Sequence, residues 1–355
     1  MEAPLRLSAN FMIAGAPVFK FFIPYGPAEY SAPAIVDNIV YVGSADGYFY
    51  AIDLIKGREI WEFPTTGAVE SSPTVSDGRV YFGTGKGILY CLDSKDGREI
   101  WRFQAKAEII SSPVVEDGVI YFNSADDKLY ALKAGTGEKL WQYSRRYIKK
   151  IVKRTFASPA VYGDKIYCNF ADGYIVAVEK SSGREVWQKA MAGEDHAGAA
   201  RFTPTIDNGL VYLINGDGFL VGLDAETGEE RWRFDTIKIS DFTASKGYMF
   251  IAGYDGSVIA MNKSGKIIWK GKTSQGIPVS MIIADKYLVV ASNYKTENTL
   301  STDIGSYVDI FDTDTGVKAW NENIDSTVSA SLSAAYNHLL LVTDHGYLRI
   351  YKSSQ

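Results

Sequence analysis

The sequence predicts an all-β fold, an eight-bladed β-propeller of four-stranded antiparallel blades. Three observations indicate this fold: a phrase that recurs about every 40 residues, seven tryptophans at one position of that phrase, and an N-terminal segment that completes the last copy. A period of this length is typical of arrays in which every copy is one supersecondary unit. We therefore expect residues 1–355 to form a single propeller.

The first three copies of the phrase begin at Ser31, Ser71 and Ser111, a spacing of 40 residues both times. They read SAPAIVDNIVYVGSADGYFYAIDLIKGREIWEF, SSPTVSDGRVYFGTGKGILYCLDSKDGREIWRF and SSPVVEDGVIYFNSADDKLYALKAGTGEKLWQY. Each copy holds four strand-sized segments separated by turn signals rich in Gly and Asp, so each predicts one blade. The later copies begin near residues 157, 202, 241, 280 and 329, and the last three of them lose the proline.

All seven tryptophans fall in the segment predicted as the fourth strand of a blade, and each follows a turn glycine. Glycine permits the positive φ of a tight hairpin, and a large indole ring can then bury its face against a neighbouring blade. We expect this column to hold the blades together. Its members are Trp61, Trp101, Trp141, Trp187, Trp232, Trp269 and Trp320.

The eighth copy ends before its tryptophan, and the N-terminal segment 18–24 is predicted to supply the missing strand. FKFFIP in this segment resembles WEFP in the first copy, and Phe21 stands twelve residues before Pro33 as Trp61 stands twelve before Pro73. Pairing of the N-terminus with the last blade closes the ring and removes an open sheet edge.

Composition excludes several classes of function. A formal net charge of −5 argues against nucleic acid as the main partner, since that role needs a basic face. No run of about 18 apolar residues is present, so we expect no transmembrane segment. The apolar stretch 11–23 is broken by a glycine, a proline and a lysine, and we do not expect it to act as a signal peptide.

The sequence also predicts no catalytic centre, no metal site and no bound cofactor. The two cysteines, Cys91 and Cys168, form no CxxC pair, and the three histidines lack metal-ligand spacing. Acidic turn residues could be Ca²⁺ ligands, but they recur once per blade, as hairpin turns do. They are Asp46, Asp126, Asp127, Asp172, Asp217, Asp255 and Asp344.

The segments that lead into the tryptophans resemble the AxDxxTGxxxW motif of the quinoprotein repeat. They read AIDLIKGREIW at 51–61, CLDSKDGREIW at 91–101, ALKAGTGEKLW at 131–141 and GLDAETGEERW at 222–232. The resemblance extends over nearly the whole chain. Among proteins with this repeat, the bare copies and the length of 355 residues are most similar to the BamB-like outer-membrane protein assembly lipoproteins, which hold no cofactor.

This resemblance implies a monomeric, non-catalytic protein-binding scaffold that is periplasmic or associated with the outer membrane. A second hypothesis stays open, in which the chain is a small quinoprotein or redox accessory that binds pyrroloquinoline quinone in the funnel of the propeller. The quinoprotein dehydrogenases resemble one another in a vicinal Cys-Cys pair, which this sequence lacks. A third hypothesis is a sensor or saccharide-binding propeller, for which the sequence offers no specific residues.

Three departures from the repeat mark the surface that we expect to bind a partner. Tryptophan to proline is twelve residues at most blade junctions, but 18 from Trp141 to Pro159 and 17 from Trp187 to Pro204. The third departure, 293–306, replaces the tight turn between the second and third strands of blade seven. Because strands alternate in direction, all three should emerge on one rim, where insertions of repeat proteins commonly serve binding.

The first insertion, SRRYIKKIVKR at 144–154, combines cationic and apolar side chains in an otherwise acidic chain. We expect partner binding through Arg145, Arg146, Tyr147, Ile151 and Arg154, with a solvated loop as the alternative. In BamB-like proteins the corresponding loop contacts the POTRA domains of the barrel-assembly protein, with an arginine five residues before the proline. Arg154 occupies that place, whereas Lys153, Ala199 and Arg201 depart from the family's pattern.

Overall fold

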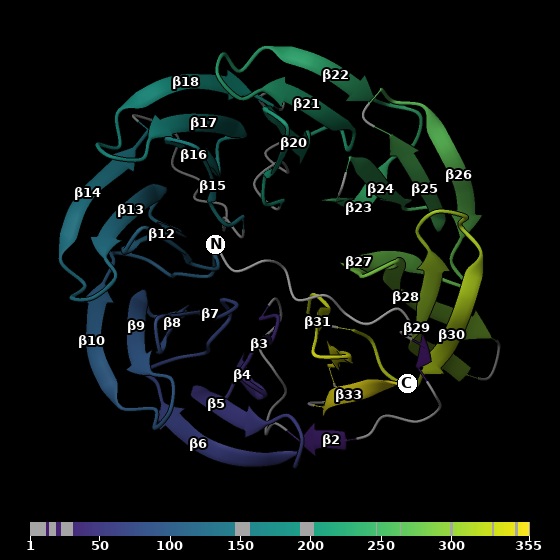
Figure 1. Cartoon of the computed structure of the whole chain (residues 1–355), viewed down its shortest axis with the longest axis horizontal. Coiled ribbons are helices and arrows are strands. Elements are labelled where there is room, and N and C mark those ends of the chain that lie inside the picture. The colour runs from purple at the N-terminus through teal and green to yellow at the C-terminus, as the bar shows by residue number, and fades with distance from the viewer. Residues whose placement is uncertain are drawn as a thin grey trace. The chain divides into compact units, whose positions relative to one another are not determined.

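The structure is a computed structural model that describes residues 12–13, 19–22, 31–145, 157–191, 202–245, 247–262, 264–298, 301–328, 330–344 and 347–354. As predicted, the fold is all-β and is an eight-bladed β-propeller (Figure 1). Each blade is an antiparallel sheet, and in the first seven blades the strands lie side by side in chain order. In the part of the chain that the structure describes, no helix is long and apolar enough to cross a membrane.

The strands of the blades have the following bounds. The first two blades comprise β3 (Ala34–Val36), β4 (Ile39–Gly43), β5 (Tyr48–Asp53) and β6 (Arg58–Pro64), then β7 (Thr74–Ser76), β8 (Arg79–Gly83), β9 (Ile88–Asp93) and β10 (Glu99–Gln104). The next two comprise β11 (Val114–Glu116), β12 (Val119–Ser124), β13 (Lys128–Lys133) and β14 (Lys139–Ser144), then β15 (Ala160–Tyr162), β16 (Lys165–Asn169), β17 (Tyr174–Glu179) and β18 (Glu185–Ala190).

Blades five and six comprise β19 (Thr205–Asp207), β20 (Leu210–Ile214), β21 (Leu220–Asp224) and β22 (Glu230–Phe234), then β23 (Ile239–Ser245), β24 (Tyr248–Gly253), β25 (Ser257–Asn262) and β26 (Ile267–Lys272). The last two comprise β27 (Ile277–Ala284), β28 (Tyr287–Asn298), β29 (Ser301–Asp312) and β30 (Lys318–Ile324), then β31 (Ser333–Ala335), β32 (His338–Val342) and β33 (Tyr347–Ser354), with β1 (Met12–Ile13) and β2 (Phe19–Phe22) added to the last sheet.

The chain divides into two compact units, each described here by itself. One unit consists of residues 47–51 and 60–236 and contains blades two to five. The other consists of residues 1–46, 52–59 and 237–355 and contains blades six to eight.

In the unit that holds blades two to five, the first strand of each blade begins at the residue that follows the repeat proline. Pro73 precedes β7 and Pro113 precedes β11 in this way, and Pro159 and Pro204 precede β15 and β19. Proline has no N–H to give to the sheet, so pairing can start only after it. The repeat proline therefore sets where each of these strands begins.

The turn between the third and fourth strands explains the polar positions of the repeat motif. In blade five the carboxylate of Asp224 accepts backbone N–H bonds from Glu226 and Thr227, both at 3.0 Å. The hydroxyl of Thr227 accepts the N–H of Glu229 at 3.3 Å. The motif Asp and Thr thus satisfy the backbone donors of the turn, an Asx-turn arrangement that stabilises hairpins.

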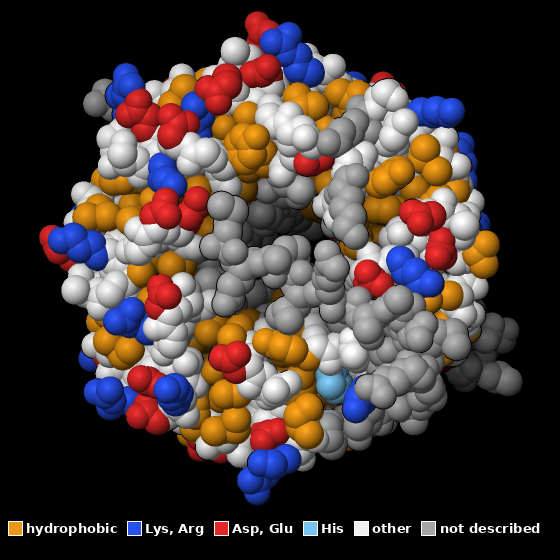
Figure 2. All heavy atoms as spheres, in the orientation of Figure 1, with side chains coloured by type: hydrophobic (Ala, Val, Ile, Leu, Met, Phe, Trp, Pro, Cys, Tyr) orange, Lys and Arg blue, Asp and Glu red, His pale blue; other side chains and the backbone are white. Residues whose placement is uncertain are grey.

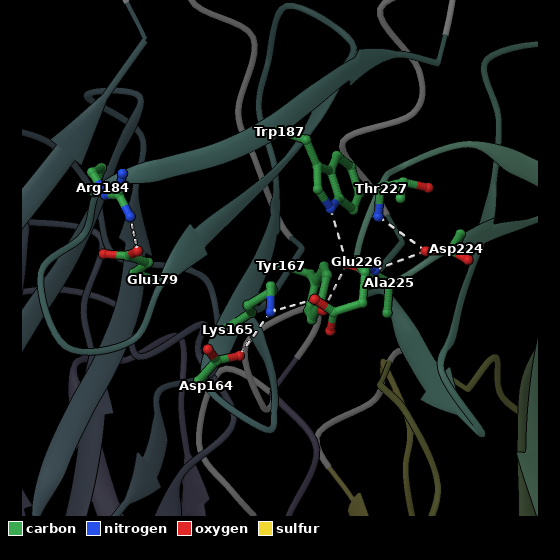
Figure 3. Close-up of polar contacts among 10 residues, drawn as sticks. All are labelled: Asp164, Lys165, Tyr167, Glu179, Arg184, Trp187, Asp224, Ala225, Glu226 and Thr227. Carbon is green, nitrogen blue, oxygen red and sulfur yellow. Dashed lines mark hydrogen bonds and ion pairs between the residues drawn. The ribbon is translucent and has the colours of Figure 1, made fainter.

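Four tryptophans of this unit, Trp61, Trp101, Trp141 and Trp187, each lie against the turn of the following blade. The Nε1–H of Trp101 donates to the carbonyl of Ala134 at 3.0 Å, and Trp187 donates to Ala225 at 2.9 Å (Figure 3). Trp61 and Trp101 are buried, whereas Trp141, Trp187 and Trp232 are partly exposed. The column therefore joins successive blades by packing and by a hydrogen bond together.

Blades four and five are also joined by a charged side chain that is nearly buried. The Lys165 ammonium lies 2.8 Å from the carboxylates of both Asp164 and Glu226, and only 9% of its side chain is exposed (Figure 3). Hydrogen bonds to these two carboxylates raise the pKa of Lys165, so it stays charged. The hydroxyl of Tyr167 donates to the same Ala225 carbonyl as Trp187, at 3.1 Å.

In the other unit, β2 pairs antiparallel with β33 and so completes the last blade, as the sequence predicted. The register differs from the one expected. Phe19 pairs with Ile350 as Trp101 pairs with Cys91, so Phe19 and not Phe21 takes the tryptophan position. The connection from this strand to Pro33 is two residues longer than at the regular junctions, such as Trp61 to Pro73, which a count from the proline cannot reveal.

The N-terminus contributes a second strand to the same edge. β1 pairs with the far end of β33, where Met12 lies opposite Ser354 and Ile13 opposite Ser353. The sequence analysis did not anticipate this strand. The edge of β33 is thus covered in two places.

In the last two blades, where the repeat proline is lost, the extra backbone N–H finds a partner in the preceding blade, whereas in blade six the N–H of Phe242 donates to the neighbouring Asp241 carboxylate at 2.9 Å. The N–H of Met281 donates to the Asp241 carboxylate at 2.8 Å, and the N–H of Leu332 donates to the Ser280 hydroxyl at 3.0 Å. Asp241 lies in the column occupied by Ser112 and Ser158 in earlier blades. The buried donor created by losing proline is therefore satisfied.

Candidate protein-interaction site

The insertions begin at the end of the blades that carries the turns between second and third strands. In regular blades the residue after the fourth strand donates its backbone N–H to that turn, as Ala105 does to Gly87 at 2.8 Å and Thr65 to Gly47 at 2.7 Å. Met191, where the second insertion starts, donates in the same way to Gly173 at 2.8 Å. Within this unit, both insertions flanking blade four therefore leave from one end of the blades.

Of the residues predicted to bind a partner, Arg145 lies within the described part of the chain. Arg146, Tyr147, Ile151 and Arg154 lie outside the described residues, as do residues 192–201 of the second insertion. The site is therefore built here from the residues that border the two insertions.

Arg145 is held against blade four at the start of the first insertion. Its Nε lies 2.8 Å from the Asp172 carboxylate, and its guanidinium lies 3.6 Å from the centre of the Tyr174 ring. A second guanidinium nitrogen donates to the side-chain oxygen of Gln188. Only 12% of the Arg145 side chain and 1% of the Asp172 side chain are exposed. The charge of Arg145 is therefore paired within the protein.

The other end of the first insertion is held by an amide. Asn123, at the end of β12, donates its Nδ2–H to the carbonyl of Ala157 at 3.0 Å. The thiol of Cys168 donates to the Oδ1 of Asn123 at 2.9 Å, which leaves the amide nitrogen free to face Ala157. Burial raises the pKa of the Cys168 thiol, so it stays protonated and able to donate.

The second insertion has similarly fixed ends. Met191 contacts two turns, because its N–H donates to Gly173 and its carbonyl accepts the N–H of Gly216 at 3.0 Å. At the far end, Asn169 donates its Nδ2–H to the carbonyl of Phe202 at 2.7 Å. Both insertions therefore leave and rejoin the blades at residues with defined hydrogen bonds.

Asn123 and Asn169 are the residues that the sequence analysis missed. They occupy the column held by Gly83 in blade two, and they stand in the two blades that immediately precede an insertion. At the short junction a side chain has no room, since a Cβ on Gly83 would lie 2.3 Å from the Ile109 side chain. An asparagine in a glycine column was the available signal.

The acidic turn residues near the first insertion accept hydrogen bonds from other residues of the same chain. Asp126 accepts hydrogen bonds from Lys128 and Tyr130, both at 2.8 Å, and Asp127 accepts the N–H of Ala171 at 3.2 Å. Burial raises the pKa of Asp127. Figure 2 shows basic and acidic side chains interspersed over the described surface of the face drawn, without one dominant basic patch there.

The third departure from the repeat is a two-stranded ribbon where the sequence analysis expected a loop. β28 and β29 stay paired from Tyr287↔Asp312 to Asn298↔Ser301, well beyond the reach of their neighbours β27 and β30. Asn293 anchors the ribbon, because its Nδ2–H donates to the Val328 carbonyl at 3.0 Å. Tyr294, Thr296 and Ile304 are aromatic or β-branched residues of the kind that favours strands.

Comparison with protein families relates this architecture to known proteins. The sequence profile of the family described as outer membrane protein assembly factor BamB matches residues 26–88, 64–232 and 216–351. The chain belongs to this family. Comparison of the BamB-family sequence with curated proteins finds no significant match.

Solved structures share the fold of this BamB-family protein. BamB from Moraxella catarrhalis is 18% identical, with a TM-score of 0.75 over 95% of this chain and 99% of that chain. The quinohemoprotein alcohol dehydrogenase from Comamonas testosteroni is 14% identical, with a TM-score of 0.74 over 98% of this chain and 78% of that chain. The computationally designed protein Ika8 is 16% identical, with a TM-score of 0.75 over 95% and 100%. At these identities the likeness shows the fold alone.

The metal-ligating side chains and the cysteines of this BamB-family protein are relevant to the quinoprotein hypothesis. Among them, no group of three or more His, Cys, Asp or Glu side chains is arranged to hold a metal ion. Cys91 and Cys168 are both buried and lie in different blades, and burial raises the pKa of Cys91 to about 12.

Proposed function

We propose that this chain is a non-catalytic protein-binding scaffold that acts in outer-membrane protein assembly. Membership of the BamB family supports this role, and the fold shared with BamB from Moraxella catarrhalis over nearly its full length is consistent with it. The proposal places the protein in the periplasm or at the periplasmic face of the outer membrane. It needs no cofactor and no metal.

The observation that carries the proposal is the pair of insertions with fixed ends on either side of blade four. Arg145 and Ala157 border the first, and Met191 and Phe202 border the second, each with a defined hydrogen bond to a turn or to a residue at the end of a strand. Loops held on a rigid scaffold are the usual place for binding residues, because the scaffold reduces the entropy lost on association.

The first insertion supplies the chemistry of the proposed contact. Arg146, Ile151 and Arg154 would meet the partner, with Tyr147 adding an aromatic anchor. Arg145 is excluded from this contact, since its guanidinium is occupied by Asp172 and Tyr174. The partner surface should therefore be acidic around an apolar centre, and we propose that it lies on the POTRA domains of an outer-membrane barrel-assembly protein.

A pull-down with purified POTRA domains tests this function. The intact protein should retain them, and a variant in which residues 146–154 are replaced by a Gly-Ser linker of equal length should not. A matched variant with the ribbon tip 297–302 replaced controls for changing any exposed segment. Retention of the domains by the linker variant at the level of the intact protein would overturn the proposal.

A second measurement addresses the quinoprotein hypothesis directly. Purified protein is mixed with pyrroloquinoline quinone and Ca²⁺, passed over a desalting column and examined for a bound chromophore. The scaffold proposal predicts a colourless protein fraction. A stoichiometric quinone spectrum in that fraction would favour the redox hypothesis instead.

A further inference from the structure

The position occupied by Arg145 is filled differently in blades whose junctions are short. Counted four residues from the tryptophan, Thr65 and Ala105 take this position in blades one and two. The Thr65 hydroxyl donates to the carbonyls of Gly47 and Gly67, and Ala105 has no side chain that could reach the next blade. An arginine that crosses to the next blade therefore accompanies the first insertion.

The contacts of Arg145 join blades three and four. Arg145 follows β14 of blade three, whereas its three partners belong to blade four. Asp172 lies in the turn between β16 and β17, Tyr174 is the first residue of β17, and Gln188 belongs to β18. Asp172 is itself oriented, because its second oxygen accepts the N–H of Tyr174 at 3.2 Å. The ion pair, the ring contact and the hydrogen bond to the Gln188 side-chain amide together hold the guanidinium in one plane. A lysine has no planar group and could not make the same set of contacts.

We propose that Arg145 is a positioning residue, whose clamp on Asp172 and Tyr174 fixes the point at which the first insertion starts. The inference rests on the proposed docking function and assigns a separate task within it. The residues after Arg145 meet the partner, and Arg145 itself holds their starting point. Asn123 does the same at Ala157, so the 11 residues between span two fixed points.

The test loosens the clamp without altering the sequence of the insertion. Asp172→Asn removes the charge that pairs with Arg145. Asp255→Asn is the matched control, because Asp255 takes the same turn position in blade six and bonds the Ser257 hydroxyl at 2.6 Å. Arg145→Lys is a second variant that keeps the charge and loses the planar contacts. Circular dichroism melting checks that every variant is folded.

The first readout is independent of any partner. Trypsin can cleave after the basic residues of 146–154, and mass spectrometry gives the rate at those sites. We expect Asp172→Asn to raise this rate about fivefold, the factor produced by a local stability change of about 1 kcal/mol. The control should cleave like the wild type. Equal rates for Asp172→Asn and wild type would overturn the clamp.

The second readout is the association rate with purified POTRA domains, measured for the same variants and for Arg154→Glu. We expect Asp172→Asn to lower this rate about fivefold, because fewer encounters find the insertion correctly placed. Weakening by Arg154→Glu alone would overturn the positioning role and leave the docking proposal standing. No effect from either variant would overturn both, since the insertion would then not be the docking element.

Discussion

Gly137 lies directly against the indole ring of Trp101 in the preceding blade. A Cβ added to Gly137 would stand 2.7 Å from the Cε3 atom of that ring, closer than real Cβ atoms approach any neighbour. The same relationship joins Gly97 to Trp61 at 2.6 Å and Gly183 to Trp141 at 2.5 Å. The motif glycine thus serves two purposes, a positive φ for the hairpin and an open face for the preceding tryptophan.

Replacing Gly137 with alanine should therefore cost more stability than the turn conformation alone explains. Gly118 is the matched control, because its φ of +74° resembles the +71° of Gly137 and no atom lies within 4 Å of its added Cβ. We expect about 1 kcal/mol for Gly118→Ala and about 2–4 kcal/mol for Gly137→Ala, measured by urea unfolding. Equal losses in the free energy of unfolding for the two variants would mean that the packing of the Trp101 indole does not require a glycine at position 137.

Stepwise deletion of the N-terminus tests how the last blade is completed. Removing residues 1–14 takes away β1 alone, whereas removing residues 1–23 also takes away β2 and its pairing with Tyr347–Ile350. The longer deletion should cost about 2–5 kcal/mol more, because it leaves a row of unpaired backbone groups on β33. Thermal unfolding of the two variants is the measurement. Coincident melting curves would show that β2 contributes nothing to the blade.

The fold could be predicted from the sequence because each copy of the repeat carries the same structure-determining residues at the same positions. Proline fixes the start of a strand, Asp and Thr cap a turn, and Gly with Trp joins two blades, so each copy supports the assignment of the others. The register of β2 was beyond this reasoning. Phe19 and Phe21 both suit a strand that replaces a tryptophan strand, and they differ only in a connection whose length no repeat specifies.

The site was less accessible to prediction because its anchors act across blades. Basic residues in the first insertion indicated a binding loop, yet nothing in the order SRRY shows that Arg145 turns inward. The position of the Arg145 guanidinium is set by its contacts with Asp172 and Tyr174, which lie 27 and 29 positions further along the chain. Long-range pairs of this kind become visible only when the blades are placed side by side.

Asp241 should make stability fall as pH rises. Burial raises the pKa of Asp241 to about 7 and outweighs the backbone N–H bonds from Phe242 and Met281 that favour the charged form. In the unfolded chain the pKa returns to about 4, so the folded state binds the proton more tightly. Its stabilising contribution is full below about pH 4 and is lost as pH rises through about 7.

Urea unfolding between pH 4 and 8 measures this effect, with Asp241→Asn as the variant that cannot titrate. The wild type should lose stability relative to Asp241→Asn across this range. Asp224→Asn is the control, because the N–H of Thr227 lowers the pKa of Asp224, so its contribution is lost only as pH falls below about 4 and should stay constant between pH 4 and 8. Parallel profiles for the wild type and Asp241→Asn would show that Asp241 does not titrate between these limits.

The dissociation constant for purified POTRA domains, measured with the wild type and Arg154→Glu, tests the central claim most directly. Lys95→Glu is the matched control, with the same charge change at an exposed residue in the turn between β9 and β10, at the other end of the blade. The docking account predicts about tenfold weaker binding for Arg154→Glu and unchanged binding for Lys95→Glu. The difference in dissociation constant between the wild type and Arg154→Glu should become smaller as salt is added. Equal dissociation constants for the wild type and Arg154→Glu would contradict it.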